Sequence, residues 1–447
     1  MKKVSLIAAA VASTLAAGTA FAAGTDVTTD GWEVHGYMSS NVRVVDGTTT
    51  DTEFGKPDYL TAGTHGKSTN QVEFTVKKHT EYENGVWANY NLRAEYGNGN
   101  SYAYTSSGSQ KKDTKAQFEV KEAFVELGGI LGEDTSIWGG QRFLNRSAGI
   151  LSGEFWKQSS GIGAGIQTKL AGKTAGIAYV MADPDAGAED KYGIDCKQDD
   201  GSISQDPSKC KVVQKGAAKR STLSSIDLYY YGVDVGIGSL DFDLKLGRQV
   251  KDGKDDDGVG ASVTLNTSYY GLDGWTQTAI AYGKGVMQNR GVNFGGWSGG
   301  DDKAESLFFT SYGVLNISDK MQLGTEATYF TSLDTLFGQE DLTRWILAAR
   351  PSYKLSDNVR LEATASYGNE ELGNPGAWGR GKDADETKVI NLEIATAFTA
   401  NSDYFGRPQV KPYISYIKAD DETSAGVIGI ENGKDQFVFG VHTEIWF

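Results

Sequence analysis

The chain has 447 residues, with 57 Gly, 22 Tyr, 18 Phe and 9 Trp but only 7 Pro, and its formal net charge is −15. This acidic balance, together with the lack of any basic run, argues against a nucleic-acid partner. After the first residues no apolar run is long enough for a membrane-spanning helix, so the high Gly and Tyr content favours a membrane β-barrel.

The first residues have the pattern of a secretory signal. Lys2 and Lys3 precede a small-apolar segment that ends at about Ala17, and Ala20-Phe21-Ala22 forms an Ala-x-Ala cleavage site. The sequence therefore predicts a signal peptide over residues 1–22 and a single exported barrel domain over residues 23–447.

Alternation of polar and apolar residues at period two begins at Trp32 and recurs to the end of the chain. It is clear at residues 32–43, 71–77, 359–367 and 409–416. In the last stretch, residues 436–447, parity places Trp446 on the polar face and Phe447 on the apolar face. Each stretch is therefore predicted to be a strand with one wet and one apolar face.

The connections between these stretches are unequal in length. Short breaks such as 83–85, 271–274 and 355–358 alternate with long polar ones such as 46–68, 97–115 and 183–220. At roughly 23–24 residues per strand and connection, the chain suits about 18 strands, and 16 remains open. The predicted fold class is all-β, a transmembrane antiparallel β-barrel.

Cys196 and Cys210, the two cysteines, stand close together in a Gly/Asp/Lys-rich loop. In an exported protein this spacing predicts a disulfide that staples the loop. The four histidines have no zinc-ligand spacing, and no cofactor is implied.

One glycine-rich motif has a structural interpretation as well as a chemical one. Residues 161–165, Gly-Ile-Gly-Ala-Gly, lack the third glycine of a nucleotide fingerprint and are predicted to relieve a bend or crowded strands. No nucleophile, base and orienting acid form a group above chance, so the protein is not predicted to be an enzyme. A barrel enzyme with dispersed active residues is the alternative.

Large aromatics on the polar faces are more informative. Tyr37, Phe405 and Trp446 share their faces with charged and amide residues. Exposing an aromatic ring to water in a polar lumen costs free energy unless a ligand stacks on the ring. Sugar rings have a C–H face that suits such stacking. We therefore expect either a sugar path or packing against an inward-folded loop.

Several stretches, spread from residue 35 to residue 446, resemble the maltoporin family of sugar-selective trimeric porins. They are His35-Gly36-Tyr37, Lys121-Glu122-Ala123, 136–143 running on to Arg146, 161–165, Arg350-Pro351-x-Tyr353-Lys354, Arg407-Pro408, Phe439-Gly440 and Glu444-Ile445-Trp446. The resemblance implies a homotrimer and a line of pore aromatics formed by Tyr37, Trp275, Phe405 and Trp446.

The resemblance also implies polar residues beside that line and a constriction. The polar positions are Glu73, Lys121 and Arg146. The inward-folded third loop is expected at about Arg146 to Gly161, with Phe155 at the constriction, or Glu154 and Trp156 if a gap is allowed.

This chain departs from the family pattern at a few positions. Ser39 replaces an arginine, Ala148 replaces an acid, and the aromatic expected near Gln71 is missing. The aromatic that the family lends to a neighbouring subunit corresponds to Tyr102 or Tyr104.

The resemblance implies a passive outer-membrane channel of a Gram-negative bacterium for maltodextrins or related oligosaccharides. Its expected partners are the oligosaccharide, outer-membrane lipid and two further copies of the chain. A non-selective diffusion porin is the first alternative, and a barrel enzyme or surface receptor is the second. Use of the exposed loops by phage as a receptor is compatible with transport.

Overall fold

The computed structural model describes residues 27–50, 60–66, 70–97, 118–182, 191–197, 210–216, 221–251, 254–295, 298–299, 302–381 and 384–447. The predicted signal peptide, Tyr102 and Tyr104 lie outside the described residues.

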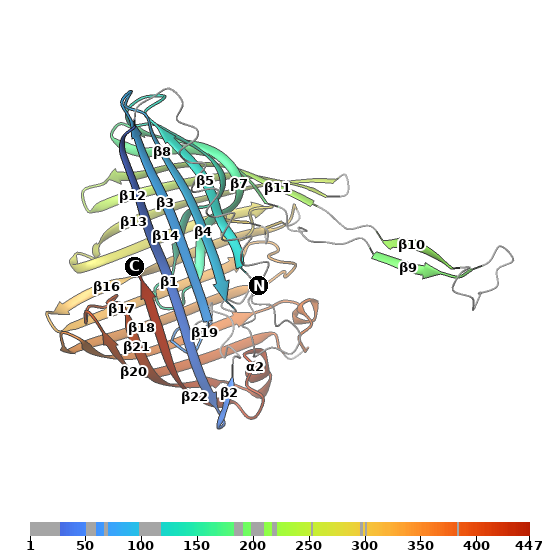
Figure 1. Cartoon of the computed structure of the whole chain (residues 1–447). Helices are drawn as coiled ribbons and strands as arrows, with labels where there is room; N and C mark the ends of the chain where they lie inside the picture. Colours follow the sequence, from blue (N-terminus) through green and yellow to red (C-terminus); the bar gives the residue numbers. More distant parts are fainter. Residues whose placement is uncertain are drawn as a thin grey trace.

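One closed barrel of 18 antiparallel strands makes up most of the described chain (Figure 1). In barrel order the strands are β1 (Val27–Val45), β3 (Asn70–Tyr82), β4 (Trp87–Gly97), β5 (Phe118–Gly128), β6 (Ser136–Ala148), β7 (Phe155–Leu170), β8 (Lys173–Ala182), β11 (Ser221–Asp234), β12 (Gly238–Lys251), β13 (Lys254–Tyr269), β14 (Leu272–Gly285), β16 (Glu305–Ser318), β17 (Met321–Ser332), β18 (Thr343–Ser356), β19 (Val359–Glu371), β20 (Glu386–Thr399), β21 (Gln409–Ala419) and β22 (Asp435–Trp446). The predicted fold class and the count of about 18 strands are confirmed, and 16 strands is excluded.

The barrel closes where β1 pairs with β22. The register runs from Tyr37 opposite Trp446 to Val44 opposite Phe439. Around the rest of the barrel each strand pairs with the next one along the wall, β1 with β3 and β8 with β11 among them. Closure pairs every strand edge of the barrel. A sheet exposed to lipid requires this, because the bilayer has no water to bond unpaired backbone groups.

Alternation along each strand separates a polar interior from an apolar exterior. On β1, Asn41 and Arg43 are buried toward the lumen, whereas Val34 and Val42 are each 55% exposed. The same division holds on β22, where His442 and Glu444 are buried and the phenylalanines are exposed. The exposed apolar side chains form a belt around the wall that suits contact with lipid tails.

The two ends of the barrel differ in their connections. One end has the short turns, at 83–86, 129–135, 171–172, 235–237, 270–271, 319–320 and 357–358, together with the connection at 400–408. The other end has most of the long connections, which include β2 (Thr48–Thr50), the 3-10 helix η2 (Pro375–Trp378) and the helix α2 (Glu422–Val427). Among the described residues no helix is both long and apolar enough to cross a bilayer.

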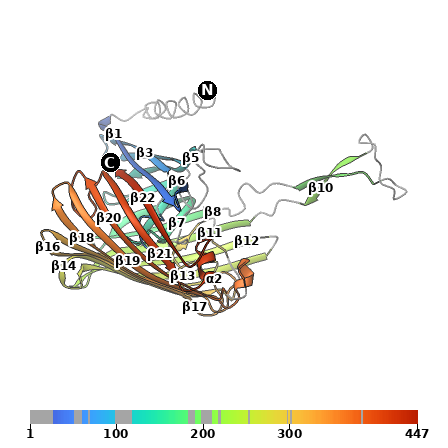
Figure 2. The same cartoon turned by 90° about the horizontal axis from the view of Figure 1, so that it is seen from below.

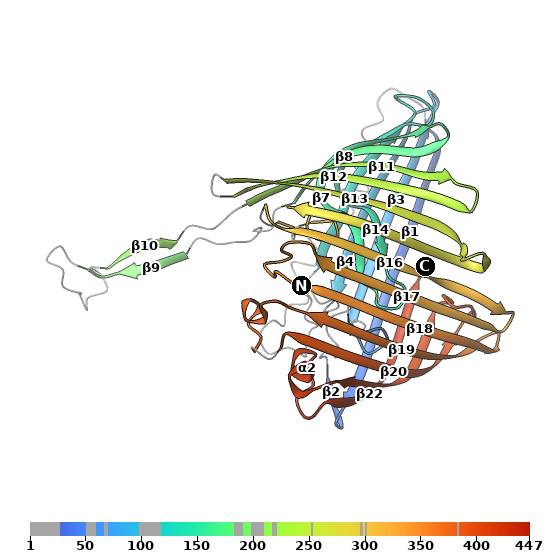
Figure 3. The same cartoon turned by 180° about the vertical axis from the view of Figure 1, so that it is seen from behind.

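A two-stranded hairpin, β9 (Lys191–Asp195) and β10 (Lys211–Gly216), belongs to the long connection between β8 and β11 and forms a sheet of its own. Figures 1, 2 and 3 show it projecting away from the barrel wall. The Sγ atoms of Cys196 and Cys210 are 2.04 Å apart, so a disulfide links the two strands where they end.

Among the described residues, three segments from the long-connection end fold into the lumen. Residues 60–66 bind the inner faces of β1, β19 and β20: Asn41 donates to the Thr64 carbonyl at 2.9 Å, and the Thr64 amide donates to Glu393 at 2.7 Å. Residues 149–154 cross to β17, and residues 286–295 are buried along their whole length. The sequence therefore predicted one of these three inward segments, residues 149–154, and missed the other two.

The third segment fills one side of the lumen. Its strand β15 (Asn293–Phe294) pairs in parallel with β7, and Met287 and Phe294 pack with Trp138 and Tyr229 of the wall. Glycines on the facing strands allow this approach, because a Cβ at Gly260 would lie 1.7 Å from the Gly291 carbonyl oxygen. The segment therefore fills the lumen beside β7 and β12–β14.

The glycines at 161–165 lie in β7, and the strand-crowding prediction for them is confirmed. A Cβ at Gly161 would lie 2.0 Å from the Met181 carbonyl oxygen, and one at Gly163 would lie 2.0 Å from that of Tyr179. Glycine is therefore required for the close approach of β7 and β8.

Ile394, near the middle of β20, is 71% exposed on the outer face. A substitution at this position tests whether the apolar belt contacts lipid. Ile394→Arg is expected to destabilise the protein by about 2–4 kcal/mol in lipid, because a charge at the bilayer midplane is poorly solvated. Urea unfolding in phospholipid vesicles measures the difference.

The control is Val212→Arg on β10, where the side chain is 75% exposed and off the barrel. This variant is expected to unfold like the parent. Equal destabilisation by the two substitutions would contradict the assignment of the outer belt to lipid.

Candidate functional site

Tyr37 and Trp446 face each other across the closing strand pair, on the lumen side of the wall. The neighbouring lumen residues, Ser39 and His442, exchange a hydrogen bond of 3.0 Å. The Tyr37 hydroxyl donates to Oε1 of Glu444 at 3.1 Å, and Trp446 remains 44% exposed. Two aromatic side chains from the first and last barrel strands therefore lie side by side in the pore.

Trp275 and Phe405 form a second pair. Trp275 is near the start of β14, and Phe405 lies in the connection 400–408 between β20 and β21. Their ring centroids are 6.3 Å apart with planes at 32°, and both side chains are about 40% exposed (39% and 40%). Tyr404 and Tyr312 support the pair edge-on, at 4.9 Å from Phe405 and 6.3 Å from Trp275.

Arg407 connects the two pairs, because it follows Phe405 by two residues and its guanidinium carbon lies 4.4 Å from the ring centroid of Trp446. Its Nε donates to Oε2 of Glu444 at 2.6 Å, and Gln409 donates to the same oxygen at 3.1 Å. The Glu444 carboxylate thereby holds both Tyr37 and Arg407. Trp275, Phe405 and Trp446 lie toward the short-turn end of the barrel, whereas Tyr37 lies midway along β1.

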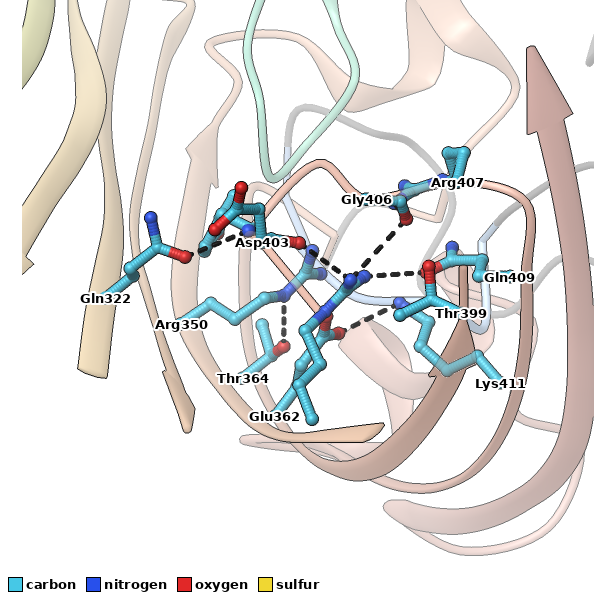
Figure 4. A network of polar contacts seen from close by, with 12 residues as sticks. Gln322, Arg350, Glu362, Thr364, Thr399, Asp403, Gly406, Arg407, Gln409 and Lys411 are labelled. Carbon is cyan, nitrogen blue, oxygen red and sulfur yellow. Dashed lines mark hydrogen bonds and ion pairs between the residues drawn. The ribbon is translucent and has the colours of Figure 1, made fainter. Parts of the chain in front are cut away.

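The connection that carries Phe405 is braced at several points (Figure 4). Lys354 of β18 pairs with Asp403 and, through this hydrogen bond, holds the pKa of that carboxyl below its usual value. Gln322 accepts the Tyr404 amide at 2.9 Å. Arg360 donates to the carbonyl of Asp403 at 2.8 Å.

Arg360 also belongs to a charged network on the inner wall of β19–β21. It donates to Glu362 at 2.6 Å and to Gln409 at 2.8 Å, and Lys411 donates to Glu362 at 3.1 Å. Figure 4 shows Glu362 reached by Lys411 below the 400–408 connection. Arg360 and Glu362 lie in the alternating stretch 359–367, but alternation alone does not predict this network.

The predicted polar positions lie on β3, β5 and β6, on the other side of the β1–β22 seam. Glu73 on β3 pairs with Arg93 and accepts from Gln71 at 2.7 Å, and Gln71 also donates to Glu95 at 2.9 Å. Gln71, the position without the expected aromatic, therefore works as a hydrogen-bonding bridge.

Lys121 on β5 joins the same group through Glu95, 3.9 Å away, and binds Glu119 at 2.5 Å. Arg93 and Glu95, which sequence reasoning missed, connect Glu73 to Lys121. Both lie on the polar face of β4, so their alternation with apolar residues was the available signal.

Arg146 on β6 has a different environment. Its guanidinium carbon lies 4.5 Å from the ring of Phe143 and 4.1 Å from the ring of Phe155. Phe155 is 40% exposed, whereas the neighbouring Trp156 is 1% exposed and stacks on Phe308. Of the two predicted constriction alternatives, Phe155 has its ring accessible and Trp156 does not.

The third loop is shorter than predicted. Arg146 and residues 155–161 belong to strands, so the loop itself is residues 149–154. The Glu326 carboxylate on β17 accepts the amides of Leu151 at 2.7 Å and Ser152 at 3.2 Å. Leu151 then packs with Ala62 from the first inward segment, so the two segments meet.

The second and third inward segments are also joined. Arg290 pairs with Glu154, and Asn293 donates to the Phe155 carbonyl at 2.8 Å. The constriction is therefore built by three cross-linked pieces of chain. Among the described residues no group of three or more His, Cys, Asp or Glu side chains is placed to hold a metal ion.

The sequence matches the family model described as LamB porin over residues 32–447. It is 24% identical over 474 aligned residues to the Maltoporin of Vibrio cholerae serotype O1, with 100% of each chain covered. It is 25% identical over 466 residues to Maltoporin 1 of Klebsiella pneumoniae, with 99% of this chain and 98% of the relative covered. A solved structure, OccAB4 of Acinetobacter baumannii, matches with a TM-score of 0.45 at 11% identity and covers 94% of this chain and 99% of its own. With its closed barrel and a family match over nearly all of its length, the chain belongs to the LamB porin family.

Proposed function

We propose that this porin is a passive, sugar-selective channel of the outer membrane of a Gram-negative bacterium, and that it works as a homotrimer. Its substrates are maltodextrins or related oligosaccharides. The observation that carries the proposal is the pairing of lumen aromatics, Tyr37 with Trp446 and Trp275 with Phe405, beside charged and amide side chains. Tyr37 is partly buried, and the other three rings are 39–44% exposed.

The aromatic pairs supply weak, repeated binding. Each ring offers an apolar face to the C–H face of a sugar, and a sugar that leaves one ring meets the next. Several weak sites raise the occupancy of the pore without trapping the solute, which is the condition for fast facilitated diffusion.

The charged residues near the path supply hydrogen bonds for the hydroxyl groups. Glu73, Lys121 and Arg146 lie on the lumen side of β3, β5 and β6, whereas Arg360, Glu362 and Lys411 are buried in the network below the 400–408 connection. Glu73 and Lys121 are already held by Arg93, Glu95 and Glu119, so they exchange bonds with a passing sugar at little reorganisation cost.

The three inward segments supply size selection. They narrow the lumen beside Phe155 and Arg146, which leaves a stacked guanidinium and an exposed ring at the same level. A linear sugar chain passes such a gap in an extended orientation, and bulky solutes are excluded. A non-selective diffusion porin would have no need for the aromatic pairs.

Trp275→Ala and Phe405→Ala are each expected to weaken the block of ion current by maltohexaose by about 1–3 kcal/mol, the scale of stacking on one aromatic side chain. Because the two rings contact each other, the double variant is expected to lose less than the sum. Planar-bilayer recordings over a concentration series give the blocking constants.

The matched control is Trp345→Ala. Trp345 packs against Tyr367 on the outer face of β18 and β19, so its removal is expected to leave the block unchanged. Current that no oligosaccharide blocks at any concentration in the parent protein would favour the non-selective porin.

Glu326→Ala tests the constriction. It removes a charged acceptor from the amides of Leu151 and Ser152, and hydrogen bonds to charged groups contribute about 1.5–3 kcal/mol each. Residues 149–154 are expected to leave the lumen part of the time, so that single-channel conductance rises and large solutes enter liposomes.

Thr328→Ala is the control for this substitution, because Thr328 lies two residues along the same strand and bonds Thr310 at 3.1 Å instead of the loop. Its conductance is expected to match the parent. Unchanged conductance in Glu326→Ala would mean that residues 149–154 do not set the pore width.

A further inference from the structure

One face of the Trp446 indole is in contact with a cation of the protein itself. The guanidinium carbon of Arg407 lies 4.4 Å from the ring centroid, within the range of a cation–π contact. A sugar ring that stacks on the same face of the indole has to move this guanidinium first. The contact is therefore a competitor for the proposed substrate.

Glu444 keeps Arg407 in this position. Oε2 of Glu444 accepts from Arg407 Nε at 2.6 Å, and Arg407 Nη1 donates to the Gly406 carbonyl at 2.9 Å. The other carboxylate oxygen accepts the Tyr37 hydroxyl at 3.1 Å. One carboxylate therefore fixes the orientation of the cation above Trp446 and of the aromatic next to it.

We infer that Arg407 is an exchangeable lid on Trp446, held by Glu444, that weakens sugar binding at the short-turn end of the pore and so speeds release there. The inference rests on the proposed function. A planar guanidinium stacks on an indole face in the same way as a sugar C–H face does, so the two replace each other.

The position of the lid determines at which end of the pore it affects sugar release. Trp446 ends β22, and Arg407 lies in the connection 400–408, so both belong to the short-turn end. Trp275 and Phe405 stack mainly on each other and on Tyr404 and Tyr312. Trp446 is therefore the path aromatic whose affinity for sugar the lid lowers, and lower affinity at this end favours escape over trapping.

Single-channel recording with maltohexaose in bilayers of known orientation tests the lid. Arg407→Gln is expected to lengthen the sugar residence that ends by exit through the short-turn end by about 2- to 5-fold, the factor that corresponds to one exposed cation–π contact. The rate of entry from the long-connection end is expected to stay unchanged.

Two further variants separate stacking from charge. Arg407→Lys keeps the positive charge beside Glu444 but lacks the planar surface, and it is expected to lengthen residence in the same direction. Glu444→Gln removes the ionic attachment of Arg407 and is also expected to lengthen it. Should Arg407→Gln fail to fold, these two variants decide the outcome.

Lys354→Ala is the matched control. Lys354 braces the same connection through Asp403 without contacting an aromatic of the path. If residence changes equally in Lys354→Ala and Arg407→Gln, general loosening of the connection explains the effect and the lid is rejected.

The remaining outcomes distinguish the lid from the proposed function. If maltohexaose blocks the ion current of the parent protein but its residence time in Arg407→Gln is unchanged or shorter, the lid alone is rejected. Absence of block in the parent rejects the sugar channel and the lid together.

Discussion

The pairing of β1 with β22 is the contact on which the rest of the structure depends. It removes the last unpaired strand edges, and it is also what brings Tyr37 next to Trp446. The seam extends to Phe447, whose amide and carbonyl bond those of Gly36 at 3.1 and 2.9 Å. The ring of Phe447 lies where a side chain at residue 36 would be, because a Cβ there would be 2.4 Å from its Cζ. Closure of the wall thus also places Tyr37 beside Trp446.

The interior tolerates buried charge where the charges are paired. Lys157 on β7 binds Asp243 on β12 at 2.7 Å, and Ser262 donates to the same carboxylate oxygen at 3.0 Å. Lys245 pairs with Asp227. An unpaired charge at these positions would be costly, whereas paired and hydrogen-bonded ones fix strand β7 against β12. This cross-bracing supports the side of the lumen that is filled by residues 286–295.

The wall was predictable from the sequence and the interior was not. Period-two alternation fixes which residues face out, as for Val34 and Asn41, because the pleat leaves no other choice. The inward segments carry no such signal. Residues 60–66 bind Glu393, more than 300 positions away, and their composition matches that of an exposed loop. The Arg407 contact with Trp446 depends on how the 400–408 connection bends, which local sequence does not encode. Family resemblance predicted the four aromatics of the proposed path, whereas Arg93, Glu95 and the Arg360 network follow from pairings between strands.

The packed segments inside the lumen separate two properties that are often treated as one. Strand number determines the circumference of the frame and its hydrogen-bond ladder. The aperture is determined by three inserts, each attached to the frame at a few points such as Glu326 and Glu393. Substitutions in an insert or at its attachment point can therefore change which solutes pass through the protein. The barrel frame that the membrane accommodates stays the same.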